Sequence, residues 1–335
     1  MGSLRSGIRA RPSFTPIVRS PSMRRRIIPA FLYLAFALLL GEAFARIVFL
    51  VPALSERVSV DDQLGWRRRW VAQHEAGTGP NPYSFDRYDP LTGWRTKPNI
   101  RNLRVFDNQT LNTNSEGFRG ARDFSVRKDT SKTRILLLGD SFTFGEDVSD
   151  DQTYGHFLEQ LLPTVEVLNF GVHGYGHDQM LELLNDVGAR YKPDVVLLGF
   201  VAAGMSRNVL RFRDHAKLWY TIHHDTLVRH GVPVPTAEET LRLDWARPRT
   251  IDFVSAVWQR LQSLESRRQA QEIITSALLA DIIRVTLSVG AQPVFAYLPD
   301  SGELADSTSV PQMEQWLHVE CLRLQQTPCF SVRPQ

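Results

Sequence analysis

Two short glycine-containing segments carry the residues whose types and spacing could do chemistry. Gly139-Asp140-Ser141 follows an apolar run, and residues 169–176 hold three glycines in six positions. A serine directly after a strand can expose its hydroxyl as a nucleophile, and backbone N–H groups at such a turn can donate to an oxyanion. Ser141 could equally be a helix cap, and the second segment a tight turn before a helix. Residue type alone leaves both interpretations open.

Several other functional motifs are missing from these loops. The residues around Ser141 do not read Gly-x-Ser-x-Gly, which excludes the nucleophile elbow of the α/β-hydrolases. No Gly-Lys-Ser/Thr phosphate loop is present, and no Gly-x-Gly follows the first apolar run. The run His223-His224-Asp225 is interpreted as a polar loop rather than a metal site. We therefore predict neither a cofactor nor a metal.

Cysteine usage is sparse. Cys321 and Cys329 are the two cysteines of the chain. Two are too few for a zinc site or a disulfide framework. A single bridge and two free thiols both stay open.

The elements that must position the two loops follow from hydrophobic patterning. Short, nearly continuous apolar runs predict five strands, at residues 134–139, 165–169, 194–201, 293–298 and 329–332. Helical patterns lie between them, at residues 154–162, 177–191, 273–287 and 310–324. Strands of this kind alternating with helices predict an α/β fold, in which a doubly wound, flavodoxin-like parallel sheet is covered on both faces.

The predicted sheet divides the chain. Residues 52–132 are polar and turn-rich, and we expect an extended, strand-poor lead-in before a domain at 133–335. A helical insertion at about 202–292 is too long for a simple crossover and is expected to cap the substrate side. Ligands of open α/β sheets bind beyond the carboxyl ends of the strands. Ser141, Gly174 and residues 202–208 should therefore converge at one edge of the sheet.

The net charge of +3 is unevenly distributed. Residues 1–26 hold seven arginines and no acidic residue, so the rest of the chain carries −4 (+3 minus +7). A body of this charge has no global nucleic-acid footprint, and we predict no nucleic-acid partner. A second basic stretch, with Arg207, Arg211, Arg213 and Lys217, is interpreted as a solvated face.

Residues 27–51 follow the basic tail and are largely apolar, interrupted by Glu42 and Arg46. As one helix they would extend about 37 Å, enough to cross a hydrocarbon core of roughly 30 Å. The arginine asymmetry places the N-terminus in the cytoplasm and the body outside. We therefore predict a single-pass anchor in the cytoplasmic membrane with a periplasmic or extracellular body. A cleaved signal ending at Ala43-Phe44-Ala45 is the alternative.

Taken together, the two loops resemble the sequence blocks of the SGNH, or GDSL-type, serine hydrolases. Gly139-Asp140-Ser141 is similar to the first block, which implies that Ser141 is the nucleophile. Residues 169–174 are similar to the second block, whose glycine donates its N–H to the oxyanion, here Gly174. Residues 88–94 and 112–120 resemble the segment before the serine block in membrane-anchored bacterial members, so the resemblance covers roughly residues 85–332.

The sequence departs from the family pattern in two places. The third block normally supplies an asparagine side chain to the oxyanion, but residues 199–205 contain none, and Asn208 is the nearest candidate. Asn208 could instead cap a helix. The family's Asp-x-x-His base motif after the fifth strand is also missing, and none of the nine histidines has an aspartate three residues earlier. We expect either a sequence truncated at its C-terminus or a degenerate member.

The resemblance implies an esterase or acyltransferase that acts on acyl, above all acetyl, esters outside the membrane. The expected substrate is an ester group on an exported or cell-surface polysaccharide. The alternative is an inactive carbohydrate- or lipid-binding member that keeps the fold. A flavin- or nucleotide-binding protein of the same strand order is a remote third interpretation, because no phosphate-binding fingerprint is present.

Overall fold

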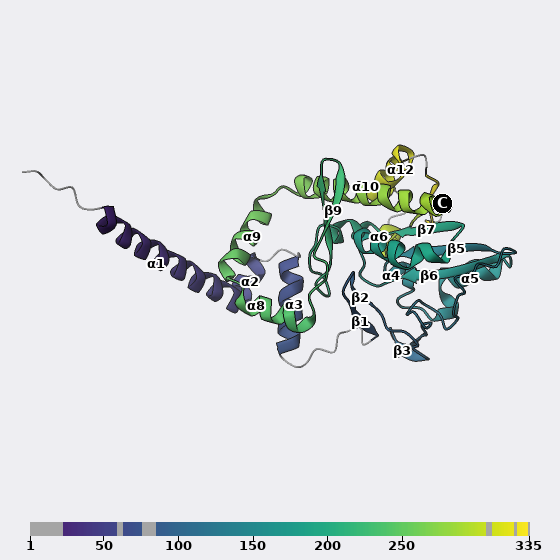
Figure 1. The fold of residues 1–335 in the computed structure, drawn as a ribbon, viewed down its shortest axis with the longest axis horizontal. Helices are drawn as coiled ribbons and strands as arrows, with labels where there is room; N and C mark the ends of the chain where they lie inside the picture. The colour runs from purple at the N-terminus through teal and green to yellow at the C-terminus, as the bar shows by residue number, and fades with distance from the viewer. Residues whose placement is uncertain (1–22, 59–62, 76–84, 306–309, 325–326, 334–335) are drawn as a thin grey trace, which may run out of the picture.

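A five-stranded parallel sheet forms the centre of the molecule in a computed structural model, which describes residues 23–58, 63–75, 85–305, 310–324 and 327–333. The strands are β5 (Thr133–Gly139), β6 (Val165–Gly171), β7 (Val195–Phe200), β10 (Gln292–Tyr297) and β11 (Cys329–Ser331). Their spatial order is β11-β10-β7-β5-β6 (Figure 1). This order is the doubly wound arrangement, and the predicted α/β fold class is confirmed.

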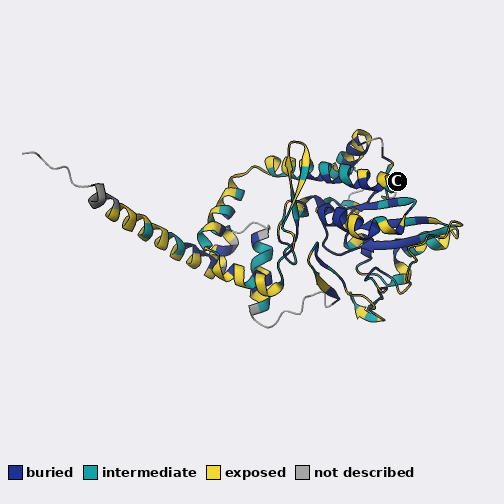
Figure 2. Ribbon diagram, viewed as in Figure 1, coloured by how far each residue is buried: buried dark blue, intermediate teal, exposed yellow. Residues whose placement is uncertain are grey.

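The apolar runs become strands because the sheet is covered on both sides. On one face, Leu136 and Leu138 of β5 are fully buried in a core that also contains residues of two helices, α6 (His177–Asp186) and α10 (Leu264–Ser288). On the other face, α5 (Tyr154–Leu161) covers β5 and β6. Figure 2 shows the strands as the most continuously buried part of the molecule. The central strand β5 pairs with β6 on one side and β7 on the other.

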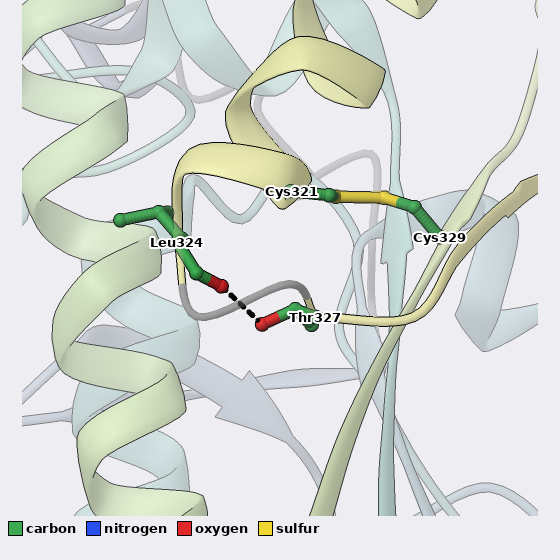
Figure 3. The surroundings of a disulfide bond; sticks show 4 residues. All are labelled: Cys321, Leu324, Thr327 and Cys329. Atoms are coloured by element: carbon green, nitrogen blue, oxygen red, sulfur yellow. Dashed lines mark hydrogen bonds between the residues drawn. A yellow bond between two sulfur atoms is a disulfide. The ribbon is translucent and has the colours of Figure 1, made fainter.

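The last strand is tied to the helix before it by a disulfide. Cys321 of α12 (Gln312–Arg323) is bonded to Cys329 of β11, with 6.3 Å between their Cα atoms. The Thr327 hydroxyl donates to the Leu324 carbonyl in the same turn, 2.7 Å away (Figure 3). Of the two states that the sequence left open for the cysteines, the structure has the bridge.

The lead-in differs from the extended segment that was predicted for residues 52–132. It begins with two helices, α2 (Pro52–Val58) and α3 (Gln63–Glu75). Two short hairpins follow, and their strands are β1 (Asp86–Asp89), β2 (Gly93–Thr96), β3 (Leu103–Val105) and β4 (Gln109–Leu111). The turn-rich pattern is explained by the hairpins. The helices were missed because α3 is highly basic and has no clear apolar stripe along its sequence.

The insertion is also arranged differently from the expected substrate-side cap. It contains α7 (Ala202–Arg207), a hairpin of β8 (Trp219–His223) and β9 (Thr226–His230), and α8 (Ala237–Ala246) and α9 (Arg249–Leu261). Helices α8 and α9 lie away from the sheet, beside α2, α3 and the end of α1 (Met23–Leu50), as Figure 1 shows. We call these five helices the helical base.

Ion pairs and a small apolar cluster hold the helical base together. Asp252 of α9 is 2% exposed and receives Arg67 of α3 at 2.7 Å and Arg247 at 2.6 Å. Phe49 of α1, Leu64 of α3 and Ala256 of α9 form one buried cluster. Arg67 and Asp252 are 185 residues apart in sequence, and Phe49 and Ala256 are about as distant, which is why local patterns did not predict their association.

One helix in the described part of the chain is long and apolar enough to cross a membrane. The candidate span is Ile28–Leu50, 23 residues with a mean hydropathy of 1.9. Within an 18-residue window of this helix, 6% of the residues are buried inside the protein. An N-terminal membrane helix was predicted, and a helix with the required length and composition is present.

Candidate functional site at the sheet edge

Three loops meet at the carboxyl edge of the sheet. Ser141 follows β5, Gly174 follows β6, and α7 follows β7. Strand β5 lies between the other two, so the edge beside Ser141 is the point at which the strand order reverses. Open α/β sheets bind their ligands at such a point. The predicted convergence of these three segments is found, whereas their catalytic roles remain predictions.

The first loop is a tight turn shaped by Asp140. Its carboxylate is 1% exposed, and Oδ1 accepts a hydrogen bond of 3.0 Å from the Phe142 N–H, capping α4 (Ser141–Phe144). Gly139 permits the turn, because a Cβ there would lie 2.0 Å from Thr143 Oγ1. Ser141 is the first residue of α4 and is partly exposed. The sequence block Gly-Asp-Ser therefore forms one structural unit.

The second loop packs directly against the first. A Cβ on Gly171 would lie 2.2 Å from the Phe144 backbone nitrogen, so only glycine fits this contact. The Asn169 side chain donates to the Thr143 carbonyl at 2.7 Å and accepts from the Gly171 N–H at 2.9 Å. Asn169 thus holds the end of β6 against α4.

Gly174 adopts a left-handed backbone conformation, with φ of +71°. A Cβ at this position would meet Arg213 Nη1 and Asp214 Oδ2, each at 2.8 Å. Within the described part of the chain, no hydrogen bond uses the Gly174 N–H or the Ser141 hydroxyl. Both polar groups are therefore free of internal partners in this arrangement.

Arg207 connects all three loops. Its Nη1 donates to Asp140 Oδ2 at 2.6 Å and to the Tyr175 carbonyl at 3.0 Å. Arg207 is itself the last residue of α7. Lys217, from the same basic stretch, is fully buried and forms an ion pair with Asp178 of α6. The interpretation of this stretch as a solvated face is therefore wrong for both residues. Their carboxylate partners, Asp140 and Asp178, lie 67 and 39 residues away along the chain, so local charge spacing gave no signal.

Asn208 is not available as an oxyanion donor in this arrangement. The residue is fully buried, and its Oδ1 accepts from the His177 N–H at 2.7 Å. Its Nδ2 donates to Thr275 Oγ1 at 2.8 Å and lies 3.0 Å from His177 Nδ1. Both amide hydrogens are therefore used within the protein. The oxyanion role assigned to Asn208 from sequence is withdrawn, because the side chain joins α6, α7 and α10 instead.

Histidines lie near the loops but not on Ser141. His173, next to Gly174, pairs with Asp86 of β1, and both side chains are 1% exposed. Burial lowers the pKa of His177 to about 3, assisted by the Arg207 charge. Burial also lowers the pKa of His215 to about 4. No described hydrogen bond joins a histidine to the Ser141 hydroxyl, and the rings of His173 and His177 are engaged by Asp86 and Asn208 instead.

The remaining candidate ligands do not gather into a metal centre. His224 and Asp225 form the turn of the β8–β9 hairpin, each with a positive φ. Among the residues that the structure describes, no group of three or more His, Cys, Asp or Glu side chains could hold a metal ion.

The fold and the edge site define an α/β protein with a partly exposed serine at the switch point of its sheet. No protein-family model matches the chain, and no curated protein matches it. Among solved structures, the crystal structure of TesA is similar over 58% of this chain and 75% of that one, with 11% identity and a TM-score of 0.34. Likeness of this degree does not assign a family.

Proposed function

We propose that Ser141 is the nucleophile of an SGNH-type site that acts on acyl esters, by hydrolysis or by transfer to an acceptor. The Ser141 oxygen would attack the acyl carbonyl, and the N–H groups of Ser141 and Gly174 would hold the oxyanion. The observation that carries the proposal is the placement of an unengaged serine hydroxyl at the switch point, with Gly174 on the neighbouring loop. Acetyl esters of an exported polysaccharide are the proposed substrates.

The general base is the part of this machinery that no described partner of Ser141 supplies. A serine hydroxyl is a weak nucleophile at neutral pH without a base, and general base catalysis contributes about 10²–10⁴-fold. An external base can take this role if the nucleophile and the oxyanion donors are in place. Imidazole is small and has a suitable pKa, so it is the probe of choice.

The test uses the 335-residue chain in mild detergent with a small activated acetyl ester and increasing imidazole. We expect acetyl transfer to Ser141, found by peptide mass spectrometry, to rise with imidazole and to be absent in Ser141→Ala. Ser206→Ala is the matched control, because Ser206 is exposed on α7 and its hydroxyl donates to the Ala203 carbonyl. Equal reactivity of the chain and Ser141→Ala at every imidazole concentration would contradict the proposal.

A second candidate is a binding protein for acylated glycans or lipids that has lost the chemistry. The observation that favours it is the engagement of Asn208, which leaves the third sequence block without an oxyanion donor. Loss of one such donor typically costs 10²–10³-fold in rate. Binding of an acetylated polysaccharide that is unchanged by Ser141→Ala, together with no acetyl-serine, would support this candidate.

A further inference from the structure

Helix α9 presents an apolar face outward. Its exposed residues include Ile251, Val254, Trp258 and Leu261, which are 51%, 65%, 63% and 75% exposed. They recur at a spacing of three or four residues and so form one stripe along the helix. The buried positions, Asp252 and Ala256, lie on the opposite face. A helix facing water has the reverse distribution, with apolar residues inward.

Helix α9 is fastened to the C-terminal half of α1. Glu42 of α1 accepts hydrogen bonds of 3.0 Å from the backbone N–H groups of both Arg249 and Thr250, at the start of α9. The rings of Phe44 and Phe253 lie 5.5 Å apart, edge to face. These contacts also give the Glu42 charge, which interrupts the apolar helix, its polar partners.

The length of α1 fixes where this junction would lie relative to a bilayer. The uncharged stretch begins at Ile27, after three arginines. At 1.5 Å per residue, a hydrocarbon core of about 30 Å is crossed after about 20 residues, close to Arg46. The residues of α1 that contact α9, from Glu42 to Phe49, span that boundary. In Figure 1, α9 runs across the end of α1 rather than along it.

We propose that α9 is an interfacial helix, whose outward stripe inserts into the outer leaflet of the phospholipid bilayer that α1 crosses. Trp258, and Trp245 at the end of α8, which is 83% exposed, would lie at the level of the headgroups. Tryptophan is enriched at this depth because its ring is apolar and its N–H is polar. The inference depends on α1 as the membrane span and is independent of the chemistry at Ser141.

A second copy of the chain is the other occupant that could cover this face. The junction argues for lipid, because a helix joined to α1 between residues 42 and 49 cannot leave the bilayer boundary while α1 spans the membrane. Lipid contact and contact with a second copy give different results in a quenching experiment.

The experiment uses the full chain in vesicles of phosphatidylcholine and phosphatidylglycerol, in which the lipid carries bromine at a shallow or a deep acyl position. Bromine quenches tryptophan fluorescence on contact. We expect quenching of the chain to fall by at least a third in Trp258→Phe and further in Trp245→Phe/Trp258→Phe. Shallow bromine should quench more than deep bromine. Trp316→Phe is the matched control, because Trp316 packs against the sheet core. The fluorescence intensity that bromine removes should be the same in this variant as in the unchanged chain.

Three results would overturn the proposal. The first is quenching that is the same with and without Trp258, which would place the stripe in water. The second is stronger quenching of Trp258 by deep bromine, which would place α9 within the hydrocarbon core. The third is a Trp258 that bromine does not quench, together with two chains that can be cross-linked to each other through α9. This result would assign the face to a second copy.

Discussion

At the scale of single residues, the edge site depends on charges that are buried and matched. Asp140 caps α4 with one carboxylate oxygen and receives Arg207 with the other. Asp178 of α6 and Lys217 form a second such ion pair, with both side chains fully buried. Removing one partner of a buried ion pair leaves the other charge unpaired. The free energy lost in this way is larger than the stability that the pair contributes.

Arg207→Met should therefore destabilise the protein strongly. Asp140 is 1% exposed, so its charge would stay buried without a cation, at a cost of about 3–5 kcal/mol. The melting temperature in mild detergent measures this effect. Adding Asp140→Asn to Arg207→Met should restore part of the loss, because the unpaired charge is removed. A single variant that melts like the unchanged chain would show that Arg207 does not hold the loops.

His177 should make stability depend on acid pH. Its pKa is lowered to about 3 by burial and by Arg207, so below about pH 6.5 the unfolded chain binds a proton that the folded one does not. The buried, neutral ring therefore costs no stability above about pH 6.5, and the free energy of unfolding decreases as the pH falls from there toward 3. Between pH 7 and pH 5 the free energy of unfolding should fall by about 2 kcal/mol through this residue.

The measurement is urea unfolding of His177→Gln at pH 7 and pH 5, compared with the unchanged chain. We expect a smaller pH dependence in the variant, while His215, whose pKa is also lowered, to about 4, retains its share. His230→Gln is the control, since His230 lies on the β9 strand and contacts Thr221. A pH dependence that His177→Gln leaves unchanged would be inconsistent with a neutral, buried ring.

Sequence predicted the residues of the edge site better than their partners. Ser141 and Gly174 were predicted from the resemblance of their loops to two sequence blocks of the SGNH hydrolases, and the structure brings both loops to the carboxyl edge of the sheet. Arg207, Lys217 and Asp86 were not, because each meets its partner across 39 or more residues of chain. For Asn208 the sequence left an oxyanion role and a helix cap open, because the positions of His177 and Thr275, which its side chain contacts, cannot be deduced from their distance along the chain.

At the scale of elements, the sheet edge is held by close backbone contacts as well as by charge. Gly139 and Gly171 end two neighbouring strands, and each allows α4 to approach its strand. These contacts position the start of α4, where Ser141 lies.

Gly171→Ala should displace α4 and lower stability. The new Cβ would meet the Phe144 backbone nitrogen at 2.2 Å, which backbone atoms cannot relieve by a rotamer change. We expect a loss of about 1–3 kcal/mol, measured as a drop in melting temperature. Gly302→Ala is the control, because its Cβ would meet the Asp300 side chain at 3.2 Å. If both variants melt alike, the contact between β6 and α4 is less close than described.

Elements with a simple pattern were predicted well, and those without one were not. All five strands of the central sheet were expected within two residues of their observed ends, because buried parallel strands are almost wholly apolar. Helix α9 was expected only as part of a helical insertion, and its pattern did not reveal that the apolar stripe points outward while Asp252 is buried. The association of α3 with α8 and α9 depends on ion pairs that span the chain.

At the scale of the whole molecule, the N-terminal arginines and the disulfide agree on an orientation. Positive charge beside the first apolar helix retains the N-terminus in the cytoplasm. A disulfide such as Cys321–Cys329 persists in oxidising compartments, which include the bacterial periplasm. We propose that the body lies outside the cytoplasmic membrane.

The orientation is tested with a reporter that is active only after export, fused after Gln335 of the full chain. We expect activity in intact cells, and its loss when the seven arginines at residues 1–26 are replaced by glutamate. A reporter active only in the cytoplasm would place the body inside. The exported chain should also take up an alkylating reagent at Cys321 and Cys329 only after reduction.

Helix α10 connects the helical base to the sheet. Its 25 residues extend about 37 Å, starting beside α9, and none before Ile274 is buried (Figures 1 and 2). A helix of this kind acts as a spacer of fixed length, unlike a flexible tether whose ends sample many separations. If α9 rests on the lipid as proposed, α10 and the packing of Trp70 in α3 against Phe212 would together hold the sheet at a fixed separation from the bilayer. An ester group on a polymer that extends from the cell surface would then meet the Ser141 loop at one fixed distance from the membrane.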